Sequence, residues 1–386
     1  MTVNVAIVAP ILARNDAISR AAIDNWRMIN SLPGHSATLL TGSSDYPDIP
    51  VKIAGNTFWL LRIAEFQKAD VIIYHFGIYS KLFNGIIIGN GKARQIVRFH
   101  NVTPAQFLPP EAKVTIERSI AQMYLFNHAY EIWADSPTNA AAVSEYAIAH
   151  PSVTVLPLLV ETPERHYLPE KHSDRIEILF LGRMVKSKGI IDLLDAISQM
   201  MARSDRLFRL RLAGNAPFSD PAIVSEIRSR AEATRHRVEF LGEVDDKTRD
   251  QLLKEAHLLA IPSYHEGFCK PVVEALRSGC IPVGYDAYNL PHITAGLGRL
   301  VPSGNVAALA EAMTEFVAIL SGATSEVFLP LNRGPTSIAD FAQLTDRHVV
   351  TFEWDSVTSG VAERLRHVLD AAPRNRGADD TLISIE

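Results

Sequence analysis

Residues 257–283, HLLAIPSYHEGFCKPVVEALRSGCIPV, contain the pattern that decides the fold. The uninterrupted apolar run from Leu258 to Ile261 is typical of a strand buried on both faces of a parallel sheet. The dipeptide PS ends that strand, and apolar residues resume at helical spacing from about Pro271. A second short apolar strand follows in SGCIPV. The order strand, loop, helix, strand predicts a parallel α/β sheet.

The same alternation of strands and helices runs through the whole chain. Strands are predicted at residues 3–9, 37–40, 71–74, 95–99, 132–134 and 153–156, and again at residues 176–181, 209–213, 238–241, 258–261 and 281–283. The fold class is therefore α/β, with two doubly wound, Rossmann-like domains at residues 1–165 and 166–350. The polar segment ETPERHYLPEKHSD is the expected hinge between them, and a ligand site is expected in the cleft that the domains form.

Two glutamates flank the start of the predicted helix, with seven residues between them. Glu266 falls in the loop after the strand, and Glu274 falls on the opening turns of the helix. A helix start at the carboxyl end of a strand offers free N–H groups and a positive dipole end to an anion such as a diphosphate. An ionised Glu can accept hydrogen bonds from vicinal hydroxyls of a sugar or ribose. The alternative is that both are ordinary carboxylates near a helix dipole.

A second segment, RIEILFLGRMVKSKGIIDLLDAI at residues 175–197, places cations between a strand and a helix. Gly182 turns the chain after the strand, Arg183 and Lys188 follow, and Gly189 precedes the helix. Arg presents a planar fork to phosphate oxygens, and Lys supplies a point charge. The pattern favours a phosphate-binding loop over a solvated one.

Several motifs together carry a resemblance to a known family. GRMVKSKGIIDLL, LRLAGN, VEFLGEV and HEGFCKPVVEAL followed by SGCIPV resemble, in order and spacing, the C-terminal motifs of the retaining GT-B glycosyltransferases of family four. The resemblance is strong from about Arg175 to Val317 and weaker in the N-terminal half. It implies two facing domains with a cleft and a C-terminal helix, at residues 352–370, that crosses back to the first domain. Residues 371–386 are expected to be a frayed tail.

The resemblance also implies roles for individual residues. Arg183 and Lys188 match the pair that binds the donor diphosphate, Glu266 matches the contact to the donor hexose, and Glu274 matches the contact to the ribose. The implied donor-binding residues are Gly182, Arg183, Lys188, Gly267, Phe268, Cys269 and Glu274. The implied catalytic residues are His100, Arg183, Lys188 and Glu266. No cofactor and no metal are implied, and the chain contains no D-x-D tripeptide, which metal-dependent glycosyltransferases of the other major fold usually carry.

The chain departs from the family pattern at three places, and one role has two candidates. Cys269 stands where many relatives have glycine, and Lys270 stands where they more often have an apolar residue; we expect Lys270 to point to water. The first loop, PILARNDAIS, contains no glycine, and its Asp16 is as well explained by a helix cap as by a role at the cleft. His75 ends the strand VIIYH and competes with His100 for the position beside the donor sugar.

The function implied is transfer of a hexose, with retention, from a nucleotide diphosphate sugar to a hydroxyl of a glycan or lipid-linked acceptor. Variants such as FHNVTP resemble bacterial exopolysaccharide and O-antigen assembly enzymes, which favours GDP-mannose weakly over a UDP-sugar. A nucleotide-sugar epimerase and a catalytically silent partner or glycan-binding subunit remain alternatives. The intact motifs argue against both.

Composition limits the partners and the compartment. A net charge of −5 gives no electrostatic case for nucleic acid, and two cysteines among 386 residues fit a reducing cytoplasm. The first residues, MTVNVAIVAP, have the composition of a strand and not of a signal peptide. The segment YSKLFNGIIIGNGKAR at residues 79–94 favours a packed helix with a basic loop; peripheral contact with the inner face of a membrane is the alternative.

Overall fold

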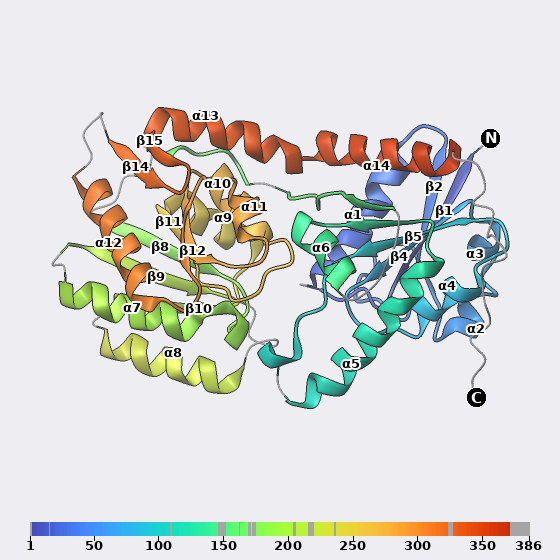
Figure 1. Cartoon of the computed structure of the whole chain (residues 1–386), viewed down its shortest axis with the longest axis horizontal. Helices are drawn as coiled ribbons and strands as arrows, with labels where there is room; N and C mark the ends of the chain where they lie inside the picture. The colour runs from blue at the N-terminus through green and yellow to red at the C-terminus, as the bar shows by residue number, and fades with distance from the viewer. Residues whose placement is uncertain are drawn as a thin grey trace.

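Two parallel sheets lie side by side in an elongated molecule (Figure 1). The structure is a computed structural model that describes residues 2–14, 16–108, 110–145, 152–161, 163–168, 171, 175–203, 206–214, 220–234, 237–322 and 327–370. The two-domain α/β fold expected from the sequence is confirmed. The tail predicted at residues 371–386 lies outside the described residues.

The first sheet has seven strands in the order β3-β2-β1-β4-β5-β6-β7. Its strands are β1 (Val3–Ala9), β2 (His35–Thr41), β3 (Val51–Ile53), β4 (Val71–Phe76), β5 (Arg94–Phe99), β6 (Glu131–Ala134) and β7 (Val153–Val155). The helices of this domain are α1 (Ala17–Ser31), α2 (Thr57–Leu60), α3 (Ala64–Lys68), α4 (Gly85–Ile88), α5 (Lys113–Gln122) and α6 (Pro137–Glu145). Val5 and Ile7 of β1 belong to one apolar cluster and Ala6 and Val8 to another, so this sheet is buried on both faces.

The second sheet has six strands in the order β10-β9-β8-β11-β12-β13. Its strands are β8 (Ile176–Leu181), β9 (Phe208–Ala213), β10 (Val238–Gly242), β11 (Leu258–Ile261), β12 (Ile281–Asp286) and β13 (Arg299–Pro302). The helices are α7 (Ile190–Arg203), α8 (Pro221–Ala233), α9 (Asp246–Glu255), α10 (Lys270–Arg277), α11 (Leu290–Thr294) and α12 (Val306–Ser321). A hairpin, β14 (Phe328–Leu331) and β15 (Gly334–Ser337), leads to α13 (Ile338–Val349).

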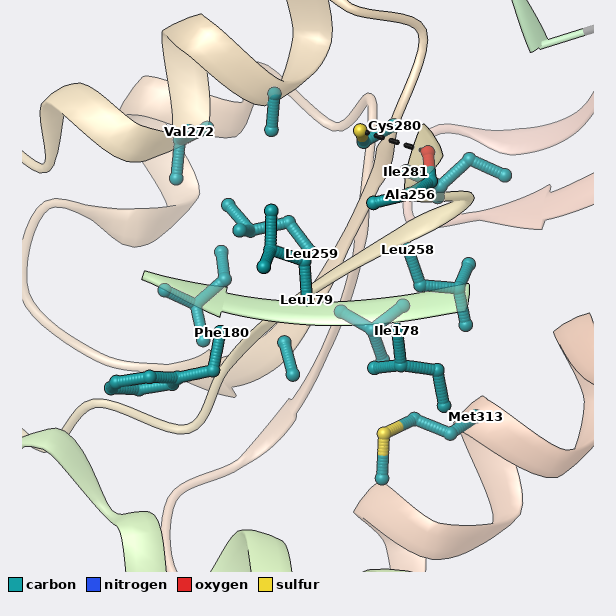
Figure 2. Close-up of a cluster of buried hydrophobic side chains, with 14 of the residues drawn as sticks. Ile178, Leu179, Phe180, Ala256, Leu258, Leu259, Val272, Cys280, Ile281 and Met313 are labelled. Carbon is teal, nitrogen blue, oxygen red and sulfur yellow. Dashed lines mark hydrogen bonds between the residues drawn. The ribbon is translucent and has the colours of Figure 1, made fainter. Parts of the chain in front are cut away.

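The core of the second domain explains why β8 and β11 are so regular. Leu258 pairs in register with Ile178, and Leu259 with Leu179, and all four side chains are buried. Figure 2 shows Val272 of α10 on one side of β8 and Met313 of α12 on the other. Apolar side chains of both strands therefore pack against helices on the two faces of the sheet. This packing explains the mostly apolar runs from which the two strands were predicted.

The last helix, α14 (Trp354–Asp370), returns to the first domain, as expected. It runs beside α1 (Figure 1), and its buried Val357, Val361, Leu365 and Val368 join the apolar cluster that contains Ile7. The spacing of these four residues is helical, so one face of α14 is apolar. The chain therefore connects the two domains twice.

Four short strands were missed from the sequence: β3, β13, β14 and β15. Each has only three or four residues, and each contains half-buried or exposed positions. Short, partly exposed strands lack the continuous apolar run that marked the central ones. The proposed boundary between residues 165 and 166 remains a prediction.

Candidate functional site

Lys188 and Glu266 meet at the carboxyl ends of two neighbouring strands. Lys188 lies in a 3-10 turn after β8, and Glu266 lies in the loop after β11. Lys188 Nζ is 2.6 Å from Glu266 Oε1, and Ser263 Oγ donates to the same oxygen at 2.8 Å. Glu266 is only 8% exposed, so this ion pair is partly removed from water. The pairing fixes a cation and a hydroxyl-binding carboxylate within one site.

The glycine after Lys188 is needed for this geometry. Gly189 has φ +63°, and a Cβ built on it would lie 1.9 Å from the carbonyl oxygen of Pro262. No side chain fits in that space, and the left-handed conformation also favours glycine. The close approach holds the turn with Lys188 directly against the end of β11.

Arg183 is not brought into this pair. Its side chain is exposed, and within the part of the chain that the structure describes it makes no hydrogen bond or ion pair. Gly182 next to it has φ +158° and is half-buried. The structure therefore places Arg183 at the mouth of the site with its guanidinium unengaged.

The loop before α10 exposes a row of backbone donors. Among the described residues, none accepts a hydrogen bond from the N–H groups of Gly267, Phe268 and Cys269. Asn289 Nδ2 donates to the Phe268 carbonyl at 2.9 Å and holds the loop from behind. No side chain in the described ranges caps α10, so its positive end also remains available to an anion.

Cys269 adopts the backbone conformation that glycine prefers. Its φ is +78°, which is strained for a residue with a Cβ, and its thiol is buried. Burial raises the pKa of the Cys269 thiol well above its usual value, and the nearby Glu266 carboxylate raises it further. The thiol is therefore neutral, and this residue acts through its backbone.

Glu274 lies one and a half turns into α10, as predicted, but it is 9% exposed. Burial raises the pKa of its carboxyl group, and the positive charges of Arg249 and Lys270 partly oppose that shift. Glu274 belongs to α10, whose first N–H groups are free, so its carboxyl group lies near the helix end that is available to an anion.

His100 and His75 do not occupy alternative positions; both belong to one buried chain of hydrogen bonds. His100 Nδ1 lies 2.6 Å from Asp135 Oδ2, and His100 Nε2 lies 2.8 Å from His75 Nδ1. His75 Nε2 lies 3.2 Å from Asn25 Nδ2, and burial lowers the pKa of His75 well below its usual value. We assign the protons from these partners: Asn25 donates to His75, His75 to His100, and His100 to Asp135. Arg98 Nε donates to the other Asp135 oxygen at 2.8 Å.

Both ring nitrogens of His100 are therefore engaged, and its side chain is 4% exposed. The sequence predicts His100 at the cleft, and its backbone does lie there: a Cβ built on Gly267 of the facing domain would be 3.3 Å from the His100 carbonyl oxygen. The ring itself sits in the buried chain behind that surface.

The prediction that Lys270 points to water is wrong. Its side chain is 22% exposed, and its Nζ lies 3.7 Å from Asp24 Oδ2 on α1 of the other domain. Burial lowers the pKa of Lys270, and the facing carboxylate of Asp24 partly opposes that shift. Asp16, in contrast, is a plain helix cap that accepts from the Ser19 N–H at 2.8 Å.

Several residues of the site were missed from sequence. Ser136 Oγ donates across the cleft to the Gly267 carbonyl at 2.7 Å, and Asn101 Nδ2 donates to Asn139 Oδ1 at 2.9 Å. Asp135 was missed as the partner of His100. A signal was present: the polar segment DSPTN directly follows β6, the immediate neighbour of β5, so its first residues had to lie beside His100.

A comparison with family models supports the resemblance over part of the chain. A family model described as "Glycosyl transferases group 1" matches residues 175–318. This region is similar to the glycosyl transferases of group 1, as the motifs of the sequence indicated. Lys188, Glu266 and the loop before α10 fall within the match.

Two curated relatives and one solved structure are also similar to this chain. It is 32% identical over 140 residues to a phosphatidyl-myo-inositol mannosyltransferase of Mycobacterium leprae, covering 35% of this chain and 36% of that one. It is 26% identical over 132 residues to the O-antigen chain mannosyltransferase B of Escherichia coli, covering 34% of each. The structure of Alr3699/HepE from Anabaena, in complex with UDP and glucose, matches with a TM-score of 0.66 at 16% identity, covering 94% of this chain and 99% of that one.

These similarities differ in extent. The matched regions span about a third of the length of the two curated relatives. The match to the Anabaena protein covers nearly the whole chain, and at its low identity it shows the GT-B fold alone. The expected fold is thus confirmed, and the expected resemblance to group 1 glycosyl transferases is supported over residues 175–318.

Proposed function

We propose that this protein transfers a hexose from a nucleotide diphosphate sugar to a hydroxyl group of a glycan or lipid-linked acceptor, with retention of configuration. The observation that carries the proposal is the Lys188–Glu266 pair at 2.6 Å beside the unpaired N–H groups of Gly267, Phe268 and Cys269. A cation and free amides suit a diphosphate, and a buried carboxylate suits sugar hydroxyls.

Each residue has a proposed role. Lys188, Arg183 and the α10 amides bind the diphosphate, Glu266 holds hexose hydroxyls, and Glu274 holds the ribose. Gly182 shapes the turn that carries Arg183. His100 is proposed to act through its backbone and through its position in the buried chain, because its ring nitrogens are both engaged.

The chemistry follows from where charge develops. The acceptor oxygen attacks the anomeric carbon from the face of the leaving group, while the bond from that carbon to the phosphate oxygen breaks. The bonding electrons leave with the nucleoside diphosphate, and the acceptor proton passes to a phosphate oxygen. Lys188, Arg183 and the helix end stabilise the negative charge that builds up, and stabilisation of this kind usually lowers a catalytic barrier more than any other single effect. The proposal needs no metal ion.

Two donor classes are supported by different observations. The names of the two curated relatives are those of mannosyltransferases, which favours GDP-mannose weakly. The Anabaena structure holds UDP and glucose, which supports a UDP-sugar as the alternative. An epimerase would consume the donor without an acceptor, and a silent subunit would bind neither GDP nor UDP.

Calorimetric titration with GDP, UDP and their sugar conjugates in the presence of EDTA tests the proposal. We expect one nucleotide to bind without metal, and Arg183→Ala to weaken that binding about tenfold or more, because the exposed guanidinium is free to bind phosphate. Arg203→Ala, an exposed arginine at the end of α7, is the control. Absence of binding by every nucleotide would contradict the proposal and favour the silent subunit.

We also propose a peripheral position at a membrane. Part of segment 79–94 is packed into the first domain, as the sequence indicated, because Leu82, Phe83 and Ile86 are buried. Exposed apolar side chains gather beside it on β3, α2 and α4, which we call the apolar patch: Ile53, Phe58, Trp59, Ile87 and Ile88, at 49% to 64% exposure. The helices α2 and α4 both pack on the turn between them, and the Thr57 hydroxyl donates to the Lys81 carbonyl.

Basic residues surround the apolar patch. The Arg62 guanidinium lies 5.5 Å from the centre of the Phe58 ring and 6.0 Å from that of Trp59. Exposed Lys68 and Lys81 have no acidic partner within the described ranges, whereas Lys52 and Lys92 are paired with carboxylates. Exposed aromatic and aliphatic side chains with adjacent cations are typical of proteins that bind anionic lipid surfaces. None of the helices in the described ranges combines the length and hydropathy that crossing a bilayer requires.

Co-sedimentation with vesicles tests this position. We expect the protein to bind vesicles that contain anionic phospholipid, and we expect the double variant Trp59→Ser, Ile88→Ser to bind at least fivefold less. Val114→Ser, an equally exposed apolar residue on α5, should bind like wild type. Binding that is independent of anionic lipid, or unchanged in the double variant, would contradict the membrane proposal.

A further inference from the structure

A cavity of about 220 Å³ lies between the two domains, beside the proposed donor loops. One wall consists of Asn101 and Val102, which follow β5, and of α6. The facing wall consists of His265 and Tyr288, from the loops after β11 and β12, and of His292 on α11. None of the residues proposed above to hold the donor lines it, although His265 is next to Glu266 in the chain.

Helix α6 presents one face to this cavity. Thr138, Ala141, Ala142 and Glu145 line it, at the spacing of residues that share one side of a helix. The two alanines leave space between the domains, and the threonine and glutamate place a hydroxyl and a carboxylate at its edges. The wall is therefore shallow, with polar groups at its two ends.

Tyr288 supplies an open aromatic surface on the opposite wall. Its ring stands edge-to-face on His265, with centroids 4.4 Å apart, and 44% of the residue stays exposed. Its φ is +48°, a left-handed conformation that is strained for a residue with a Cβ. Asn101, on the other wall, has φ +76°. Strained backbone on both walls of one cavity is typical of ligand sites.

The charge of the lining restricts the ligand. Burial is the main reason that the pKa of His265 falls to about 4; the Glu266 carboxylate opposes this shift and the Lys188 ammonium adds to it, so this imidazole is neutral at pH 7. Glu145 is exposed and supplies a carboxylate, and no Lys or Arg is among the described residues that line the cavity. A phosphate in this cavity would meet the Glu145 carboxylate and, among the described lining residues, no Lys or Arg, whereas an uncharged polyol would find acceptors and donors.

We infer that this cavity binds the sugar ring of the acceptor, and that the ring is an uncharged pyranose stacked on Tyr288. The inference rests on the proposed transferase function and adds the chemical class of the acceptor to it. Tyr288 contacts the apolar C–H face of the ring, and Glu145, Thr138 and Asn101 bind its hydroxyls. A hydroxyl of this ring, adjacent to the Glu266 loop, is the attacking group.

Ligand-observed NMR with a matched pair of probes tests the inference. The probes are methyl α-D-mannopyranoside and its 6-phosphate, titrated into protein whose nucleotide site is filled with GDP or UDP, whichever binds. We expect the uncharged probe to bind at least tenfold more tightly than its phosphate. We expect Tyr288→Ala to weaken it at least tenfold, and Tyr288→Phe and the exposed Tyr124→Ala to retain it.

The nucleotide titration on the same samples separates the two proposals. If no nucleotide binds the wild type, the transferase proposal fails. If a nucleotide binds and the uncharged probe does not, or the phosphate binds better, or Glu266→Gln abolishes probe binding while Tyr288→Ala has no effect, the acceptor assignment is overturned. Unchanged nucleotide affinity in Tyr288→Ala shows that this variant is folded.

Discussion

Replacing Lys188 with alanine is expected to lower kcat by a factor of about 100 to 1,000, the scale of losing one preorganised electrostatic donor. Lys188 Nζ is held by Glu266 at 2.6 Å within a turn that Gly189 locks against β11, so its charge has a fixed position in the site. The loss should appear mainly in kcat, because the leaving diphosphate is more negative in the transition state than in the bound donor. Steady-state kinetics of sugar transfer or donor hydrolysis measures it.

Lys186→Ala is the matched control for Lys188→Ala. Lys186 belongs to the same 3-10 turn but is exposed, and its side chain makes no ion pair in the described part of the chain. We expect its kcat to stay within about twofold of wild type. If both lysine variants lose activity equally, the effect comes from disrupting the turn, and the proposed role of Lys188 fails.

Replacing Asp135 with alanine is expected to reduce the free energy of unfolding by about 3 to 5 kcal/mol, the scale for breaking a buried ion pair. Arg98 is 1% exposed, and its pKa is lowered by burial, so its charge depends on the Asp135 carboxylate. The same substitution removes the partner of His100 Nδ1 at 2.6 Å. Urea unfolding followed by circular dichroism measures the change.

Asp70→Ala is the surface counterpart of this experiment. Asp70 pairs with Lys92 at 2.9 Å, but both side chains are at least a third exposed. Such pairs contribute about 0 to 1 kcal/mol. If Asp135→Ala costs no more than Asp70→Ala, the chain from Arg98 to Asn25 does not hold the first domain together.

The strands that the sequence predicted best are those buried over most of their length. Residues 3–9, 176–181 and 258–261 were predicted with the bounds that the structure has, because each is a mostly apolar run between two covered faces. Strand β13 was missed, since Arg299 and Leu300 are half-buried at the sheet edge and a proline ends it. Edge strands depend on pairing with a neighbour, which a local pattern does not reveal.

The candidate site, too, was predicted from the sequence only in part. The resemblance implied that Lys188 and Glu266 belong to one donor site, and the structure brings them together because both follow neighbouring strands of one parallel sheet. The pairing of Lys270 with Asp24 could not be predicted from the sequence, because Asp24 belongs to the other domain. The hydrogen bond between His100 and His75 depends on the orientation of both rings at the ends of β4 and β5. Asn25 and Asp135, which lie on other elements, fix that orientation, so a local sequence pattern does not reveal it.

The central claim is retaining transfer from a nucleotide sugar by a site that needs no metal. Proton NMR of the anomeric signal, recorded during turnover of the preferred donor in EDTA, tests it most directly. We expect the first product to carry the sugar in the same anomeric configuration as the donor, at a rate that EDTA does not change. A product of inverted configuration, or turnover that stops in EDTA, would contradict it.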